Sequence, residues 1–153
     1  MSPTMSVHLR YAFHMVLIEA LLVATFIDFD LWIIPDGVTL PAMAVGFLGN
    51  VAIGRVHLVP AWAQYTSIFA GALPDVPAWC SKHPHLHGLL VATAGFVVGG
   101  GIVWTVRILG QWALKREAMG FGDVVLMAMI GSFVGWQASV IVFFLAPVMA
   151  ILV

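Results

Sequence analysis

Two groups of carboxylates mark the boundaries of apolar stretches in this chain. Asp28 and Asp30 close the first apolar stretch, and Asp123 opens a later one. An ionised carboxylate beside a bilayer is energetically unfavourable, so an acidic residue in such a place indicates a function. Two facing carboxylates share a proton near neutral pH, which makes one a general base and the other a general acid. We therefore interpret Asp28 and Asp123 as a candidate acid–base pair.

Composition indicates that membrane helices carry these residues. Of the 153 residues, 62% are hydrophobic and only 8% are charged, whereas soluble domains carry about 25% charged residues. At about 20 residues per span, the length predicts an all-α, polytopic transmembrane helix bundle of about 4–6 helices, formed by one membrane domain over 1–153. The net charge of −1 gives no reason to expect a nucleic-acid partner. The sequence leaves the oligomeric state open.

Five apolar stretches are the predicted spans, and they cover 11–27, 38–53, 89–109, 124–134 and 137–153. The last two are so close together that they form either two short helices or one long kinked helix. The segment at about 55–88 contains four prolines and is predicted to be a loop or interfacial insertion, because proline breaks helices. Within it, 61–72 is predicted to lie as a short interfacial helix, with aromatic side chains at the headgroup level.

The basic residues do not decide the membrane orientation. If the two acidic sites share a face, three basic residues lie on that face and three lie on the other, so the positive-inside rule has no clear majority. The pair Lys115-Arg116 is closest to a membrane end and favours a cytoplasmic acidic face. The six residues are Arg107, Lys115 and Arg116 against Arg10, Arg55 and Lys82.

The first acidic site is predicted to lie where one helix ends and the next begins. Asp28 terminates the first predicted span, and Pro35-Asp36-Gly37 is typical of a turn, since Pro presets φ and Gly accepts a positive φ. Asp36 or Thr39 is predicted to cap the second helix. The alternative is that all three carboxylates, Asp30 included, are solvated loop residues at a membrane surface.

The second acidic site follows two glycines. Gly120 and Gly122 allow a break in helical geometry and a close approach of backbones, which leaves room for an extended peptide. Asp123 then opens a helix, where the dipole favours an anion. Taken alone, Gly-x-Gly-Asp is also compatible with a plain turn and an Asp N-cap. The functional interpretation depends on the pairing with Asp28.

Together the two sites resemble the type IV prepilin peptidases, a family of membrane aspartyl proteases. The resemblance covers about 20–138 and includes Ile-Asp-Phe-Asp, Ile-Pro-Asp-Gly-Val-Thr-Leu-Pro and Gly-Phe-Gly-Asp-Val. It implies that Asp28 and Asp123 are the catalytic pair, supported by Asp30, Asp36, Gly120 and Gly122. It further implies a hydrolase without a metal or other cofactor. The implied substrate is a prepilin or pseudopilin, cut after a Gly that precedes its apolar helix.

The resemblance also implies a location and leaves an alternative. The expected place is the bacterial inner membrane, with several spans and the active site near the cytoplasmic face, in a type IV pilus or protein secretion pathway. The alternative is a non-catalytic protein. It is either an inactive relative that binds pilin-like helices, or a small transport or assembly component that uses the acidic sites for protons.

Three features depart from the family pattern. The family usually has Lys two residues after the second Asp, where this chain has Val125. Many bacterial members carry paired Cys-x2-Cys motifs, whereas this chain has the single Cys80, so methyltransferase activity is not expected. The family often ends with a further helix bearing a Pro-Phe-Gly-Pro-like motif, and this chain stops at Val153. Three explanations stay open: a fragment, a minimal peptidase, or a diverged relative.

Other polar and small residues receive structural interpretations. Glu19 lies about 900° around the helix from Asp28, so on roughly the opposite face, and we expect it to bond another helix in its protonated form. His14 is expected to be packed or interfacial. The run of three glycines at 99–101 predicts a close contact between helices. The single cysteine excludes an internal disulfide, and no metal site is expected at Cys80, His83, His85 and His87.

Overall fold

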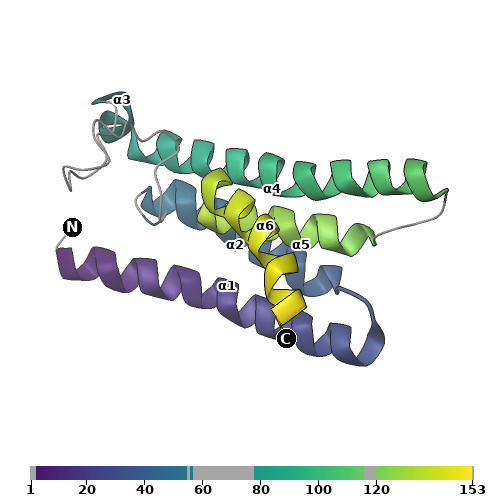
Figure 1. Cartoon of the computed structure of the whole chain (residues 1–153). Helices are drawn as coiled ribbons and strands as arrows, with labels where there is room; N and C mark the ends of the chain where they lie inside the picture. Colours follow the sequence, from purple (N-terminus) through teal and green to yellow (C-terminus); the bar gives the residue numbers. More distant parts are fainter. Residues whose placement is uncertain (1–2, 55, 57–77, 116–119, 153) are drawn as a thin grey trace.

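The computed structural model describes residues 3–54, 56, 78–115 and 120–152, and within these ranges the secondary structure is helical without strands. The long helices run side by side, and a short one lies at one end (Figure 1). This confirms the predicted all-α bundle. The elements are α1 (Pro3–Leu31), α2 (Asp36–Ile53), α3 (Ala78–Lys82), α4 (Pro84–Leu114), α5 (Phe121–Val134) and α6 (Trp136–Leu152).

Three of these helices are long and apolar enough to cross a membrane, namely those over Thr4–Leu31, Asp36–Ile53 and Pro84–Ala113. Large apolar side chains cover their outer surfaces, such as Phe26 and Leu48, which are 70% and 68% exposed. A water-soluble surface does not carry so many exposed apolar side chains. The chain is therefore a multi-pass membrane protein.

The helix bounds differ from the predicted spans at several ends. Helices α1 and α4 are longer than predicted at both ends. The predicted loop over 55–88 is too long at its C-terminal end, because α3 begins at Ala78 and α4 begins at Pro84. Pro84 is compatible with a helix because proline is tolerated in the first turn. The predicted interfacial helix over 61–72 lies outside the described residues.

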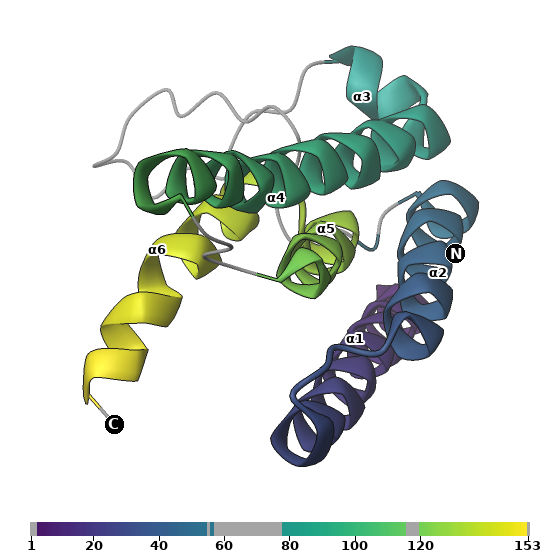
Figure 2. The same ribbon diagram turned by 90° about the vertical axis from the view of Figure 1, so that its right-hand side faces the viewer.

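Helix α5 occupies the centre of the bundle (Figure 2) and contacts α1, α2, α4 and α6. Its 14 residues give a length of about 21 Å, which is less than the roughly 30 Å of a bilayer's hydrocarbon core. Gly135, with a φ of 85°, separates it from α6. The last two apolar stretches are thus two short helices, and α5 is too short to be a span on its own.

Glycines set the contact between α4 and α5, which is the most extensive helix contact among the described residues. A Cβ at Gly95 would overlap the carbonyl oxygen of Gly131, and one at Gly99 would lie 2.5 Å from the carbonyl oxygen of Met127. The predicted glycine contact is confirmed at 99 and 100, whereas Gly101 has nothing within 4 Å. Small residues let membrane helices approach to backbone contact, so α4 holds α5 in a fixed position.

A buried polar contact and an aromatic contact join the remaining helices. The Asn50 side chain of α2 donates hydrogen bonds to its own helix at Gly46 and across to the backbone carbonyl of Ser132 in α5, at 3.0 and 2.9 Å. The rings of Phe13 in α1 and Phe133 in α5 lie 4.7 Å apart. The buried residues of α1 run from Phe13 through Leu17 and Ala20 to Ala24, so α1 is packed along its middle, and Ala24 lies one turn before Asp28.

The cap predicted for α2 is wrong. Pro35 is the N-cap residue, and no side chain caps the helix. The N–H groups of Val38 and Thr39 bond the Pro35 carbonyl instead, at 3.0 and 3.2 Å. The Thr39 side chain is buried between the helices, and its hydroxyl donates a hydrogen bond to the same Pro35 carbonyl at 3.4 Å. Asp36 is exposed in the first turn, where a negative charge complements the helix dipole.

Candidate active site

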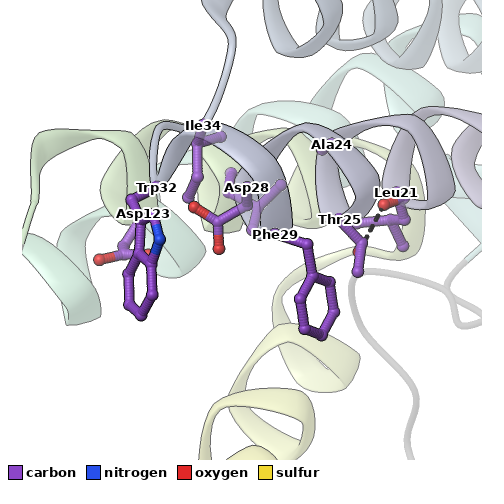
Figure 3. Close-up of a pocket in the computed structure, with 9 residues that line it drawn as sticks. Leu21, Ala24, Thr25, Asp28, Phe29, Trp32, Ile34 and Asp123 are labelled. Atoms are coloured by element: carbon purple, nitrogen blue, oxygen red, sulfur yellow. Dashed lines mark hydrogen bonds between the residues drawn. The ribbon is translucent and has the colours of Figure 1, made fainter.

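Asp28 and Asp123 line the same pocket, although they are far apart in the sequence (Figure 3). Asp28 lies near the C-terminal end of α1, and Asp123 lies in the first turn of α5. The pocket has a volume of about 320 Å³. Its lining is otherwise mainly apolar and consists of Leu21, Ala24, Thr25, Phe29, Trp32, Ile34 and Leu126. The two acidic sites therefore share one end of the bundle.

Helix α1 presents one face to this pocket. Leu21, Ala24, Thr25 and Asp28 follow the i, i+3, i+4, i+7 spacing that puts residues on one side of a helix. The helix continues to Leu31, so the prediction that Asp28 terminates it is wrong. Its continuation keeps Asp28 on the same stripe as the other three residues. Sequence reasoning missed those three, although their spacing was visible.

A close contact between the Gly122 backbone and the Ile34 side chain brings the start of α5 to the α1–α2 connection. A Cβ at Gly122 would lie 3.0 Å from the Cβ of Ile34, a distance tighter than ordinary packing. The absence of that Cβ lets Ile34 pack against the first turn of α5 and line the pocket. Gly120 is the N-cap residue, and a Cβ there would meet nothing closer than 3.8 Å. Of these two glycines, only Gly122 therefore lies where a side chain would be too close to a neighbour.

The carboxyl of Asp123 is partly buried and lies close enough to Asp28 for a direct electrostatic effect. It belongs to the first turn of α5, outside the three helices that are long enough to cross a membrane. Burial raises its pKa above the ordinary value of 3.8, and the Asp28 carboxylate raises it further. A hydrogen bond from the Gly120 N–H opposes both effects. Asp123 thus retains a proton more readily than an isolated aspartic acid.

That hydrogen bond defines the helical role of Asp123. Gly120 is the N-cap, so Asp123 is the third residue of the helix, and its side chain reaches back to the N-cap N–H. This is the reciprocal half of a capping box. The interpretation of Asp123 as the N-cap residue is therefore wrong, because the N-cap is Gly120, three positions earlier. Asp123 nevertheless stabilises the start of the helix. One side chain caps α5 and faces the pocket.

The other predicted acidic residues lie outside the pocket. Asp30 is exposed in the last turn of α1, and Asp36 is exposed in the first turn of α2. Both lie at the same end of the bundle as Asp28, but neither lines the cavity that Asp28 and Asp123 share. The structure thus brings together two of the four acidic residues in the candidate set.

Position 125 faces a different side of α5. Val125 lines an apolar cavity of about 490 Å³ between α2, α4 and α5, together with residues such as Leu40, Phe96 and Trp104. It does not line the aspartate pocket. The position where the family usually has lysine therefore lies on the apolar side of α5, away from the pocket of the two carboxylates. Arg107 lies over the Phe121 ring at this end of the bundle, 5.7 Å from the ring centroid.

The remaining polar candidates do not converge. Over the described residues, no group of three or more His, Cys, Asp or Glu side chains could hold a metal ion. His85 instead bonds the carbonyl of Val51 at 2.7 Å. His14 is half-buried and bonds the Arg10 carbonyl of its own helix. Glu19 is exposed on α1, so the predicted bond to another helix is wrong for the part of the bundle that the structure describes.

These features define a helical membrane protein with two carboxylates in one pocket near the end of its bundle. The chain belongs to the type IV leader peptidase family, which matches residues 15–153. It is 29% identical over 124 residues to a prepilin leader peptidase/N-methyltransferase of Klebsiella pneumoniae, and 31% identical over 126 residues to one of Aeromonas hydrophila.

The matched region is a minor part of those relatives. The alignments cover 81% and 82% of this chain but only 41% and 33% of the two relatives. A Pseudomonas putida protein with the same name is 29% identical over 134 residues, or 36% of its length. No solved structure matches the chain.

Proposed function

We propose that this chain is an aspartic-type endopeptidase that removes the leader peptide of type IV prepilins or pseudopilins at the membrane boundary. The single observation that carries the proposal is the pocket shared by Asp28 and Asp123. Membership of the type IV leader peptidase family supports the same activity. The relatives' name also includes N-methyltransferase, and we limit the present proposal to peptide cleavage.

In the proposed reaction, the two carboxyl groups share one proton. The Asp28 carboxylate takes a proton from a water molecule, and the carboxylic acid of Asp123 donates its proton to the carbonyl oxygen of the scissile bond. The water oxygen attacks the carbonyl carbon to give a tetrahedral diol. Asp28 then passes the proton that it took from water to the amide nitrogen, the C–N bond breaks with loss of the amine, and Asp123 recovers a proton from a diol hydroxyl, which restores the starting pair. The raised pKa of Asp123 suits it to the acid role. No covalent intermediate with the enzyme forms.

The position of the pocket fits a substrate that is itself anchored in the bilayer. We propose a multi-pass location in the bacterial inner membrane, with the aspartates near the cytoplasmic face. At that boundary water can reach the carboxylates, which the hydrocarbon core would exclude. A single domain over 1–153 would hold the complete carboxylate pair. Asp30, Asp36, Gly120 and Gly122 are proposed as supporting residues rather than reacting groups.

The test is cleavage of a prepilin in membranes. The probes are the prepilin substrates of the Klebsiella pneumoniae and Aeromonas hydrophila relatives, co-expressed with the wild-type chain, Asp28→Asn or Asp123→Asn. Each substitution should reduce cleavage by about 10²–10⁴-fold or more, since a positioned acid or base contributes that much. Asp30→Asn and Asp36→Asn are matched controls, and we expect cleavage to persist in both.

Two outcomes would overturn the proposal. Cleavage that survives either Asp28→Asn or Asp123→Asn would contradict the assignment of the pair. Binding of a prepilin by the wild-type chain, without cleavage of any probe, would instead favour the non-catalytic alternative.

A further inference from the structure

Trp32 has an unusual backbone conformation directly after α1. Its φ of 56° is left-handed, and among the described residues only Lys115 shares this feature outside glycine. Helices commonly end on a left-handed residue, but glycine is the usual choice because it has no Cβ to strain. A bulky side chain there is an outlier. The tryptophan therefore occupies a position where the backbone alone would favour glycine.

The indole lies at the mouth of the aspartate pocket. Trp32 is 89% exposed and lines the shared pocket together with both carboxylates. It also lines an adjoining cavity of about 300 Å³ with Gly120 and Gly122. In Figure 3 the ring stands beside the two aspartates. A peptide bound across Asp28 and Asp123 would therefore lie next to this ring.

Two neighbouring side chains extend the apolar rim. Phe29 is 80% exposed and lines the shared pocket, and Ile33 is 63% exposed and lines the adjoining cavity. An exposed tryptophan is also typical of a membrane interface. Trp112 offers a comparison, because it is 84% exposed near the C-terminal end of α4. Trp112 is part of a regular helix and lines neither cavity, unlike Trp32.

We propose that Trp32 is a substrate-contacting residue that packs against an apolar side chain next to the scissile peptide bond. The inference rests on the proposed function and deepens it, because it names a specificity determinant of the same site. A peptide drawn across the two carboxylates is extended, and its side chains alternate between its two sides. Phe29, Trp32 and Ile33 form an apolar rim. The peptide side chains that point toward this rim would contact an apolar surface. Residues held in such sparsely populated backbone conformations cluster at active sites and ligand contacts, which fits this role for Trp32.

The test compares Trp32→Gly with wild type. Glycine removes the indole and fits the left-handed backbone, so this variant should melt at or above the wild-type temperature. Its KM for the prepilin of the Klebsiella pneumoniae relative should rise by about 10-fold or more, the loss expected from one buried aromatic side chain. Trp32→Phe should recover part of the affinity. Trp112→Ala, the control, should keep the wild-type KM.

A second measurement separates this inference from the proposed function. Binding of the same prepilin, carrying a fluorescent label, to the Asp123→Asn protein is followed by fluorescence anisotropy, with and without Trp32→Gly. Weaker binding with glycine supports the inference even if the wild-type chain cleaves nothing. An unchanged KM and unchanged binding in Trp32→Gly would overturn it, and so would a wild-type chain that binds no prepilin. An equal effect of Trp112→Ala would assign both tryptophans to membrane anchoring and overturn it as well.

Discussion

The backbone contact between α4 and α5 can be tested by Gly99→Ala. A Cβ at this position would lie 2.5 Å from the Met127 carbonyl oxygen, whereas ordinary contact begins at 3.4 Å, so the helices must separate locally by roughly 0.9 Å. The obstacle is backbone, and it cannot rotate away. Such overpacking costs about 1–3 kcal/mol. Met127 lies one turn from Asp123, so the displacement reaches the pocket.

We expect Gly99→Ala to lower both the melting temperature in detergent and the rate of prepilin cleavage. A misplacement of about 1 Å can reduce an enzymatic rate by about 10²-fold, and this sets the upper range of the loss. Gly101→Ala is the matched control, since it makes the same change two residues later in the same helix with nothing within 4 Å. A Gly99→Ala protein with wild-type stability and rate would refute the reasoning, as would an equal loss in Gly101→Ala.

Two further predictions concern charge and polarity. The raised pKa of Asp123 means that the folded state holds this proton more tightly than the unfolded state, so its contribution to stability is greatest at acidic pH and falls as pH rises through the folded pKa. Asp28→Asn removes the part of the pKa increase that the Asp28 charge causes. Between about pH 4 and about pH 7, the melting temperature of this variant should therefore fall less than that of wild type. An equal fall of the melting temperature in both proteins, or an equal change in Asp30→Asn, would contradict this. Asn50→Ala removes the bond to the Ser132 carbonyl and should lower the free energy of unfolding by about 1–2 kcal/mol. Ser132→Ala keeps that backbone acceptor and should cost less in the same denaturation assay, and the reverse order would count against the role of Asn50.

The sequence predicted the helical class and the two acidic sites because both depend on local patterns. It did not predict where α1 ends, since no strong helix breaker occurs between Asp28 and Pro35, and the helix continues to Leu31. Residues before a proline are biased toward extended backbone, which fits an end at this point. The approach of Asp28 to Asp123 was inferred from the pairing of two motifs rather than from any property of either motif alone.

Contacts between distant segments were harder to predict. Gly95 and Gly99 form a Gly-x3-Gly pattern that signals a close helix contact, but the pattern does not identify the partner helix. The partner surface, at Met127 and Gly131, became apparent only in the structure. The left-handed backbone of Trp32 had no local signal either, because turn rules expect glycine or asparagine there.

The sparse contact between α1 and α5 has a kinetic consequence. Both helices line the pocket, yet α1 is held mainly by α2 and by the core residues Phe13, Leu17 and Ala20 in its middle. The exposed lining residues Thr25, Phe29 and Trp32 face the outside of the bundle. The membrane-anchored substrate that we propose would need no route through water under this arrangement. It would reach the carboxylates by diffusion within the plane of the bilayer, so its encounter rate would depend on the number of substrate molecules per area of membrane rather than on their concentration in solution.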